Sequence, residues 1–271
     1  MSSRAWALLR DARYALPGRI GAMMPQPDPA RLARAMARRG LNATFGYFAG
    51  DDSPAHTIVA AHARLAEALT ASATPAYLSL KAPQLGFDPQ AVDQIADLGL
   101  ELVFDAHAPA QADRTLALAE RFAAGCVIPA RWRRSLGDAV RLRDAAVRVR
   151  LVKGEWADPE ADAADPGQAY LDLVRELAGR SAPVAVASHD PALVRQALTV
   201  LSEAGTPCEL EQLHGLPRRR TAAIARELGV PVRIYLPHGP GWWPYAIDKA
   251  LGRPYLPQWW LADIFGLSPS A

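Results

Sequence analysis

Lysine is rare in this chain, and its three copies stand where chemistry could occur. Lys81, Lys153 and Lys249 are the only lysines among 30 Lys and Arg residues. Guanidinium is a rigid fork of donors that stays charged, whereas an ammonium is a compact charge whose pKa shifts readily on burial. A chain that uses Arg at nearly every basic position can keep Lys where the smaller group is needed. The three lysines therefore mark candidate functional positions.

Eight short β-rich runs must position these residues, and stretches rich in Ala, Leu, Arg and Glu separate them. The runs cover residues 43–48, 76–80, 100–104, 126–130, 147–152, 183–187, 208–212 and 232–236. Strands that alternate with helical stretches predict an α/β fold, here a (β/α)8 TIM barrel. The barrel would occupy residues 39–271 after an N-terminal helical segment over 1–38. The competing architecture is an open doubly wound sheet, but no Gly-x-Gly-x-x-Gly follows the first run.

Polar side chains gather where the predicted strands end, which is the active face of a barrel of this kind. The set comprises Lys81, Asp105, His107, Arg131, Arg150, Lys153, Ser188, His189, Asp190, Glu209, Glu211, His214, Tyr235 and His238. Any one of them could be a solvated loop residue. Together they favour a ligand pocket at this face.

One helix start in this set has a specific signature. In the segment 188–191, Asp190 is a candidate N-cap and Pro191 suits the first helical position. Backbone N–H groups beside His189 would then form an anion site. Simple helix capping explains the same residues equally well.

A second proline predicts a helix near the C-terminus. Pro244 would begin it, which brings Tyr245, Asp248 and Lys249 to one face at spacings of three and four residues. An exposed Asp beside Lys is usually a weak solvated pair. Because two tryptophans and a tyrosine precede it here, this face could instead cover a pocket.

Bulk composition predicts a globular protein in a cytoplasmic setting. Hydrophobic residues make up 50% and charged residues 21%, and the net charge of +2 shows no nucleic-acid footprint. Cys126 and Cys208 lie in apolar contexts, as buried reduced thiols do. Near the N-terminus the apolar run from Ala5 to Leu9, broken by Arg10, Asp11 and Arg13, is too short and too charged for a signal peptide or a membrane span, so membrane contact is expected to be peripheral at most.

Several segments resemble the proline dehydrogenase family in order and spacing. Residues 150–154, Arg-Leu-Val-Lys-Gly, resemble its flavin-binding strand, and residues 80–86 resemble the segment with its substrate-binding lysine. Further similar segments are 104–106, 188–191, 209–215 and 232–239 with 243–245. The resemblance extends over residues 40 to 255.

This resemblance implies a (β/α)8 barrel that holds FAD and oxidises proline at the carbon next to nitrogen. By position it assigns Arg150, Val152, Lys153, Gly154, Trp156, Ser188, His189, Asp190 and Glu211 to the flavin. It assigns Lys81, Asp105, Leu213, Tyr235, Tyr245, Asp248 and Lys249 to the substrate and catalysis. A positive group near the flavin would stabilise the anion formed on reduction.

The chain departs from the family at positions that contact the substrate or flavin. Asp248 and Lys249 stand where the family has two adjacent arginines that clamp the proline carboxylate. Pro129 and Arg131 replace the glutamine and tyrosine of a Gln-Ala-Tyr segment, and Glu211 replaces a glutamine. These replacements predict altered substrate specificity.

The expected function is therefore an FAD-dependent dehydrogenase acting on a proline-like imino acid or related amine. Its partners would be that small molecule and a quinone or other electron acceptor, with no nucleic acid. One alternative is a metal-dependent barrel hydrolase or lyase that uses Asp105, His107, His189, Glu211, His214 or His238. The other is a barrel that binds a ligand or partner without chemistry. Bound flavin would separate the first reading from both alternatives.

Overall fold

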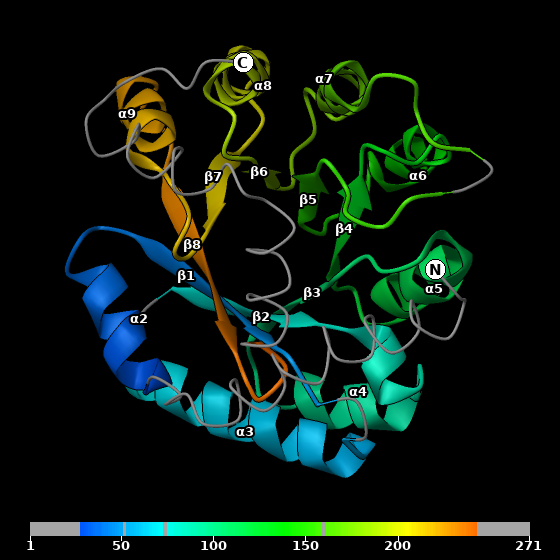
Figure 1. Cartoon of the computed structure of the whole chain (residues 1–271), viewed down its shortest axis with the longest axis vertical. Coiled ribbons are helices and arrows are strands. Elements are labelled where there is room, and N and C mark those ends of the chain that lie inside the picture. Colours follow the sequence, from blue (N-terminus) through cyan, green and yellow to red (C-terminus); the bar gives the residue numbers. More distant parts are fainter. Residues whose placement is uncertain (1–27, 51–52, 73–74, 159–160, 243–271) are drawn as a thin grey trace, which may run out of the picture.

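Eight parallel strands close into a barrel in chain order (Figure 1). The computed structural model describes residues 28–50, 53–72, 75–158 and 161–242. The strands are β1 (Asn42–Tyr47), β2 (Ala76–Leu80), β3 (Glu101–Phe104), β4 (Gly125–Pro129), β5 (Val149–Val152), β6 (Val184–Ala187), β7 (Cys208–Leu213) and β8 (Val232–His238). Each lies within two residues of the predicted run. The predicted (β/α)8 barrel is confirmed.

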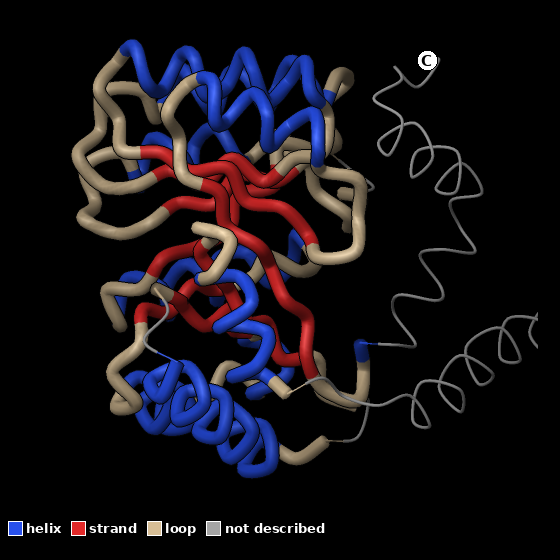
Figure 2. Tube along the Cα trace, turned by 90° about the vertical axis from the view of Figure 1, so that its left-hand side faces the viewer, coloured by secondary structure: helices blue, strands red, loops and turns tan. Residues whose placement is uncertain are grey.

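Helices surround the strands on the outside of the barrel (Figure 2). They are α2 (Pro29–Ala37), α3 (Ala55–Ser72), α4 (Pro89–Ala96), α5 (Ala112–Arg121), α6 (Ser135–Leu142), α7 (Pro166–Glu176), α8 (Pro191–Glu203) and α9 (Arg219–Glu227). Two short 3-10 helices, η1 (Ala82–Leu85) and η2 (Pro109–Gln111), lie in the loops after β2 and β3. Residues 1–27, within the segment expected to be helical, lie outside the described residues.

An aspartate followed by proline starts four of these helices. Asp28, Asp88, Asp165 and Asp190 each accept a hydrogen bond from a backbone N–H of the first turn. Proline suits the next position because its fixed φ is already helical and its missing N–H would have had no partner there. The predicted helix start at Asp190 is confirmed.

The side chains of each strand alternate between an apolar layer under the helices and a largely polar barrel interior. Thr44 pairs in register with Tyr77 and Tyr235, and Gly46 pairs with Ser79, so these alternate positions share the inward face. Outward-facing strand residues pack under the helices in one continuous hydrophobic cluster. Inside the barrel the buried apolar residues Tyr77, Val103 and Val127 form a smaller cluster. Buried polar and charged side chains, among them Ser79, Arg150 and Glu211, occupy other positions in the interior.

The two cysteines are free thiols and differ in burial. Cys126 is buried, and burial raises its pKa to about 12, which leaves it inert at neutral pH. Cys208 is half-buried, so the expectation of two buried thiols is wrong for this residue. Among the described helices, none has the length and apolar character needed to cross a membrane.

Candidate active site

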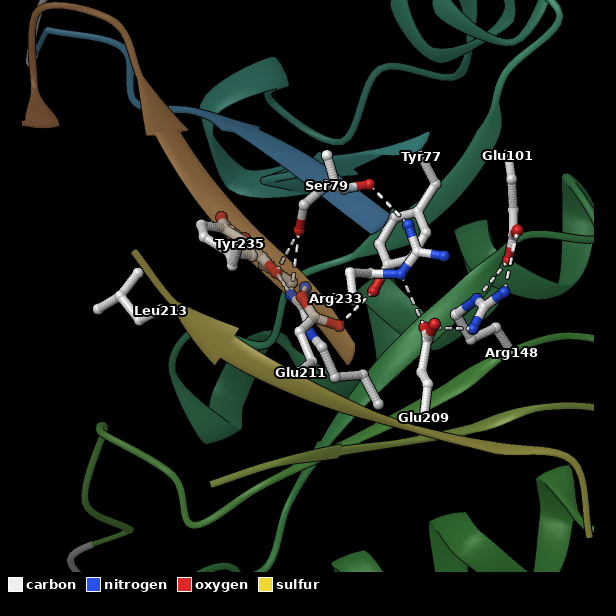
Figure 3. A network of polar contacts seen from close by, with 12 residues as sticks. Tyr77, Ser79, Glu101, Arg148, Glu209, Glu211, Leu213, Arg233 and Tyr235 are labelled. Carbon is white, nitrogen blue, oxygen red and sulfur yellow. Dashed lines mark hydrogen bonds and ion pairs between the residues drawn. The ribbon is translucent and has the colours of Figure 1, made fainter. Parts of the chain in front are cut away.

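Ion pairs fill the amino-terminal half of the barrel interior (Figure 3). Arg148 bonds to Glu101 at 2.7 Å and to Glu209 at 2.6 Å, and Arg233 bonds to the same Glu209 at 2.8 Å. Both guanidiniums also lie over the ring of Tyr77, at 5.0 and 4.4 Å from its centroid. Because this half is occupied by its own side chains, a ligand can enter only from the carboxyl ends of the strands.

Asp105 is the centre of a second polar cluster at that open end. Its Oδ2 accepts from Lys81 Nζ at 2.9 Å and from the Tyr235 hydroxyl at 3.2 Å. Its Oδ1 accepts from Ser79 Oγ at 2.6 Å and from the Arg150 guanidinium. Side chains of β2 and its end, of β5 and of β8 thus all donate to this one carboxylate.

Arg150 crosses the barrel interior and is held by acceptors from three other strands. Its Nη1 donates to Glu211 Oε1 at 2.9 Å, and its Nη2 donates to Ser79 Oγ at 3.0 Å and to Asp105. Arg150 is 4% exposed and Glu211 is 2% exposed. The second oxygen of Glu211 accepts from the Tyr77 hydroxyl. Buried ionic groups need such complete hydrogen bonding, since desolvation would otherwise cost more than their attraction returns.

The charges of this cluster determine the ionisation of its members. Burial alone would raise the pKa of Asp105, but Lys81 and Arg150 beside it hold that pKa below its usual range. Burial lowers the pKa of Lys81, and Asp105 opposes this change. Burial and then the Asp105 charge raise the pKa of Tyr235, which keeps its phenol protonated. The Asp105 carboxylate therefore stays ionised between the basic side chains of Lys81 and Arg150, with the protonated Tyr235 phenol beside it.

The Lys81 ammonium is oriented on three sides. Besides Asp105, its Nζ contacts the Tyr235 hydroxyl at 3.3 Å and lies 3.9 Å from the centroid of the Phe48 ring. A cation over an aromatic face is attracted by the ring quadrupole. Lys81 is 8% exposed, so it is held at the base of the barrel mouth.

The loop after β5 lies across the end of β4 and is anchored by Arg131. The Arg131 N–H donates to the Lys153 carbonyl at 2.9 Å, and its Nε bonds to Asp162 at 2.6 Å. Gly154, with φ of +98°, lies so close to β4 that a Cβ there would be 2.9 Å from Pro129 Cβ. Pro129 at the end of β4 and Arg131 just after it therefore pack against the loop after β5.

The rim between β5 and α8 carries exposed groups of opposite charge. Lys153 Nζ lies 3.4 Å from Asp190, and the two side chains are 52% and 41% exposed. The Asp190 carboxylate also accepts from the N–H groups of Ala192 and Leu193 at 3.0 and 3.3 Å. Ser188 Oγ accepts from the Asp190 N–H at 3.1 Å. The expected anion site at this helix start thus already holds a carboxylate of the chain.

His189 connects two loops through both ring nitrogens. Its Nε2 accepts from the Leu213 N–H at 3.1 Å, so its Nδ1 carries the proton that is donated to the Pro217 carbonyl at 2.7 Å. The ring is therefore neutral in this arrangement. His189 holds the end of β7 in place, and Leu213 lies beside the polar cluster without joining it (Figure 3).

The histidines do not assemble a metal site. Within the described residues, no group of three or more His, Cys, Asp or Glu side chains could hold a metal ion. Burial lowers the pKa of His107, of His214 and of His238, which lie after β3, after β7 and at the end of β8. The described part of the chain thus gives no support to a metal-dependent hydrolase.

The structure brings together some predicted site residues and separates others. Lys81, Asp105, Arg150, Glu211 and Tyr235 form the cluster around Asp105. At the rim lie Val152, Lys153, Gly154, Trp156, Ser188, Asp190, His189 and Leu213. The positions of Tyr245, Asp248 and Lys249 lie outside the described residues.

Tyr77 and Ser79 are members of the cluster that the sequence analysis did not single out. They are the two polar side chains of β2 and share its inward face. Because they are two residues apart on one strand, the sequence could have indicated that both side chains point to the same face. It could not indicate that Arg150 and Glu211, far along the chain, would be their partners.

Sequence comparison finds similarity to curated proline dehydrogenases over most of the chain. No family model matches it. Proline dehydrogenase 1 of Bacillus subtilis subsp. natto is 25% identical over 252 residues, which cover 83% of this chain and 82% of the relative. Proline dehydrogenase of Deinococcus radiodurans is 32% identical over 128 residues, which cover 45% of this chain and 41% of that protein. The chain is thus similar in sequence to proline dehydrogenases, at 25% identity over most of its length.

Solved structures with a similar fold support the barrel architecture. Proline utilization A from Bdellovibrio bacteriovorus, in a crystal structure inactivated by N-propargylglycine, superposes with a TM-score of 0.71 at 18% identity. The match covers 88% of this chain and 33% of that much longer protein. The same enzyme from Corynebacterium freiburgense gives a TM-score of 0.69, also at 18% identity. At this identity the likeness establishes the fold, and function must be argued from the site.

Proposed function

We propose that the protein is a flavin-dependent dehydrogenase of the proline dehydrogenase type. It would oxidise a proline-like imino acid or a related amine at the C–N bond and pass the electrons to a quinone or other acceptor. The observation that carries this proposal is the cluster of Lys81, Asp105 and Tyr235 at the open end of the barrel. These are the residues that the family resemblance assigns to the substrate.

The rim of the barrel fits a flavin dinucleotide in its donor set. Lys153 is an exposed cation that pairs with Asp190 beside the first turn of α8, and it would turn from that carboxylate to a phosphate of the cofactor. Trp156 is 51% exposed and lies near the His107 ring, with centroids 6.2 Å apart, so it offers an apolar planar surface. With Ser188, these residues would hold the cofactor. Bound flavin would supply the acceptor for the two electrons removed from the substrate.

The cluster would bind and orient the substrate in a site that excludes water. Asp105 keeps Lys81 charged, and Arg150 keeps Asp105 ionised, so Lys81 Nζ remains a positive hydrogen-bond donor. The Tyr235 hydroxyl accepts from Lys81 and donates to Asp105, which fixes the position of that ammonium. Preorganised donors of this kind need no rearrangement during the reaction.

Proline itself should be a poor substrate. The family clamps the proline carboxylate with two arginines, and the sequence has Asp248 and Lys249 at those positions. Replacing a charge-assisted partner by a carboxylate costs about 1.5–3 kcal/mol or more in a desolvated site. Turnover of proline should therefore remain far below about 10 per second, a typical enzyme rate.

The proposal is tested by titrating the purified protein with FAD and recording the flavin spectrum and the heat of binding. A perturbed spectrum with saturable binding is expected, followed by bleaching under anaerobic conditions with an oxidisable cyclic amine. Absence of FAD binding at saturating concentration would exclude a dehydrogenase and leave a barrel that binds a ligand without chemistry. Efficient proline turnover would contradict the proposed change in specificity, but it would leave the proposed dehydrogenase activity intact.

A further inference from the structure

Glu211 pairs with Arg150, a buried cation at the open end of the described barrel. Its carboxylate bonds to Arg150 at 2.9 Å, while Ser79 and Asp105 occupy the other guanidinium nitrogen. Both partners of the pair are buried. The resemblance to the proline dehydrogenase family implies an uncharged glutamine at the position of Glu211, and a glutamine could not form this ion pair.

The two cations of the cluster are matched by two carboxylates. Lys81 pairs with Asp105, and Arg150 pairs with both Asp105 and Glu211. Replacing Glu211 by glutamine would leave the same four positions with one net positive charge. In a buried site such a charge decides whether an anionic group is attracted, because screening by water is weak there.

We propose that Glu211 sets the charge preference of the mouth, so that the ring substituent of the substrate facing this cluster is uncharged. This inference rests on the proposed function and narrows its substrate class to cyclic amines that carry an amide, an ester or no substituent in place of a free carboxylate. Glu211 acts through Arg150 and is a positioning residue. A free carboxylate would have to compete with Asp105 and Glu211 for cations that they already hold.

Two probes of nearly equal shape isolate the effect of charge. Tetrahydro-2-furoic acid carries a carboxylate on a five-membered ring, and tetrahydro-2-furamide carries a neutral amide at the same carbon. Neither has a ring nitrogen to oxidise, so binding is measured without turnover. The readout is the ratio of the two dissociation constants from calorimetry, with and without FAD. A loss of folding stability alone would weaken the binding of both probes equally and leave the ratio of their dissociation constants unchanged.

Three variants separate the role of Glu211 from a general change in charge. Glu211→Gln removes one of the two carboxylates that pair with Arg150, Glu211→Asp keeps the negative charge, and Glu209→Gln makes the same charge change one layer deeper on β7. Glu209 is a matched control because it pairs with Arg148 and Arg233 and makes no contact with Arg150. The FAD titration is run on every variant.

The native protein should bind the amide more tightly than the acid. Glu211→Gln should shift the ratio toward the acid by about tenfold or more, while Glu211→Asp and Glu209→Gln should shift it by less than about threefold. Tighter binding of the acid by the native protein would overturn the inference, even if Glu211→Gln failed to fold. Equal shifts in Glu211→Gln and Glu209→Gln, or no binding of either probe, would also overturn it. Failure of the proposed function shows separately, as absent FAD binding.

Discussion

Gly46 on β1 leaves the space that the phenol of Tyr235 occupies. A Cβ built on Gly46 would overlap the hydroxyl oxygen and the adjoining ring atoms of Tyr235. The missing side chain on one strand thus places the hydroxyl of another beside Lys81 and Asp105.

Gly46→Ala should displace Tyr235 from the cluster. Overpacking of a buried position costs about 1–3 kcal/mol, and the variant should also bind cyclic ligands more weakly because an oriented hydroxyl is lost. Urea unfolding and ligand calorimetry measure the two effects. Gly137→Ala in α6 is the control, since its Cβ would meet no atom within 4 Å. A Gly46→Ala protein with native stability and ligand binding would contradict this account.

Arg150→Met should destabilise the protein strongly. The substitution leaves Asp105 and Glu211 without their shared cation in a buried site, and breaking a buried pair in this way costs about 3–5 kcal/mol. Chemical denaturation gives the free energy of unfolding. Arg195→Met removes an arginine from an exposed pair with Glu227 and should have a far smaller effect. Similar losses in the two variants would show that the barrel cluster does not stabilise the fold.

His62 should make the protein less stable in acid. Burial lowers the pKa of His62 from 6.5 to about 4, so the folded protein resists protonation of this ring while the unfolded chain does not. Stability from this group is therefore complete above pH 6.5 and is lost as the pH falls through 4, in total about 3 kcal/mol. The measurement is the free energy of unfolding at pH 7 and pH 4.

His62→Gln should flatten that pH dependence. The exposed His56 lies on the same helix, so His56→Gln is the matched control and should retain the native profile. If both variants keep the native slope between pH 7 and pH 4, another group causes the acid sensitivity.

Asp190→Asn should strengthen FAD binding about two- to fivefold. Asparagine still caps α8, but the negative charge beside Lys153 is removed, so an anionic phosphate meets a more positive rim. Calorimetric FAD affinity is the readout. Asp165→Asn changes the N-cap of α7 in the same way and should leave FAD affinity unchanged. Equal affinities of the native protein and Asp190→Asn would place the phosphates elsewhere.

The sequence by itself determined the barrel and the helix start at Asp190. Both depend on local patterns: apolar runs of strand length, helical stretches between them, and an N-cap aspartate followed by proline. It also indicated that Lys81, Asp105 and Tyr235 stand at strand ends on one face. Parallel strands in a closed barrel bring such ends together whatever their separation along the chain.

Only the tertiary structure decided what those residues contact. Arg150 was assigned to a flavin by resemblance, yet its guanidinium bonds to Ser79, Asp105 and Glu211, which come from three other strands. Such partners depend on strand register and on the tilt of side chains across the interior, which no local pattern encodes. The pairing of Lys81 and Arg150 with Asp105 and Glu211 follows from these contacts, so it depends on closure of the strands into a barrel.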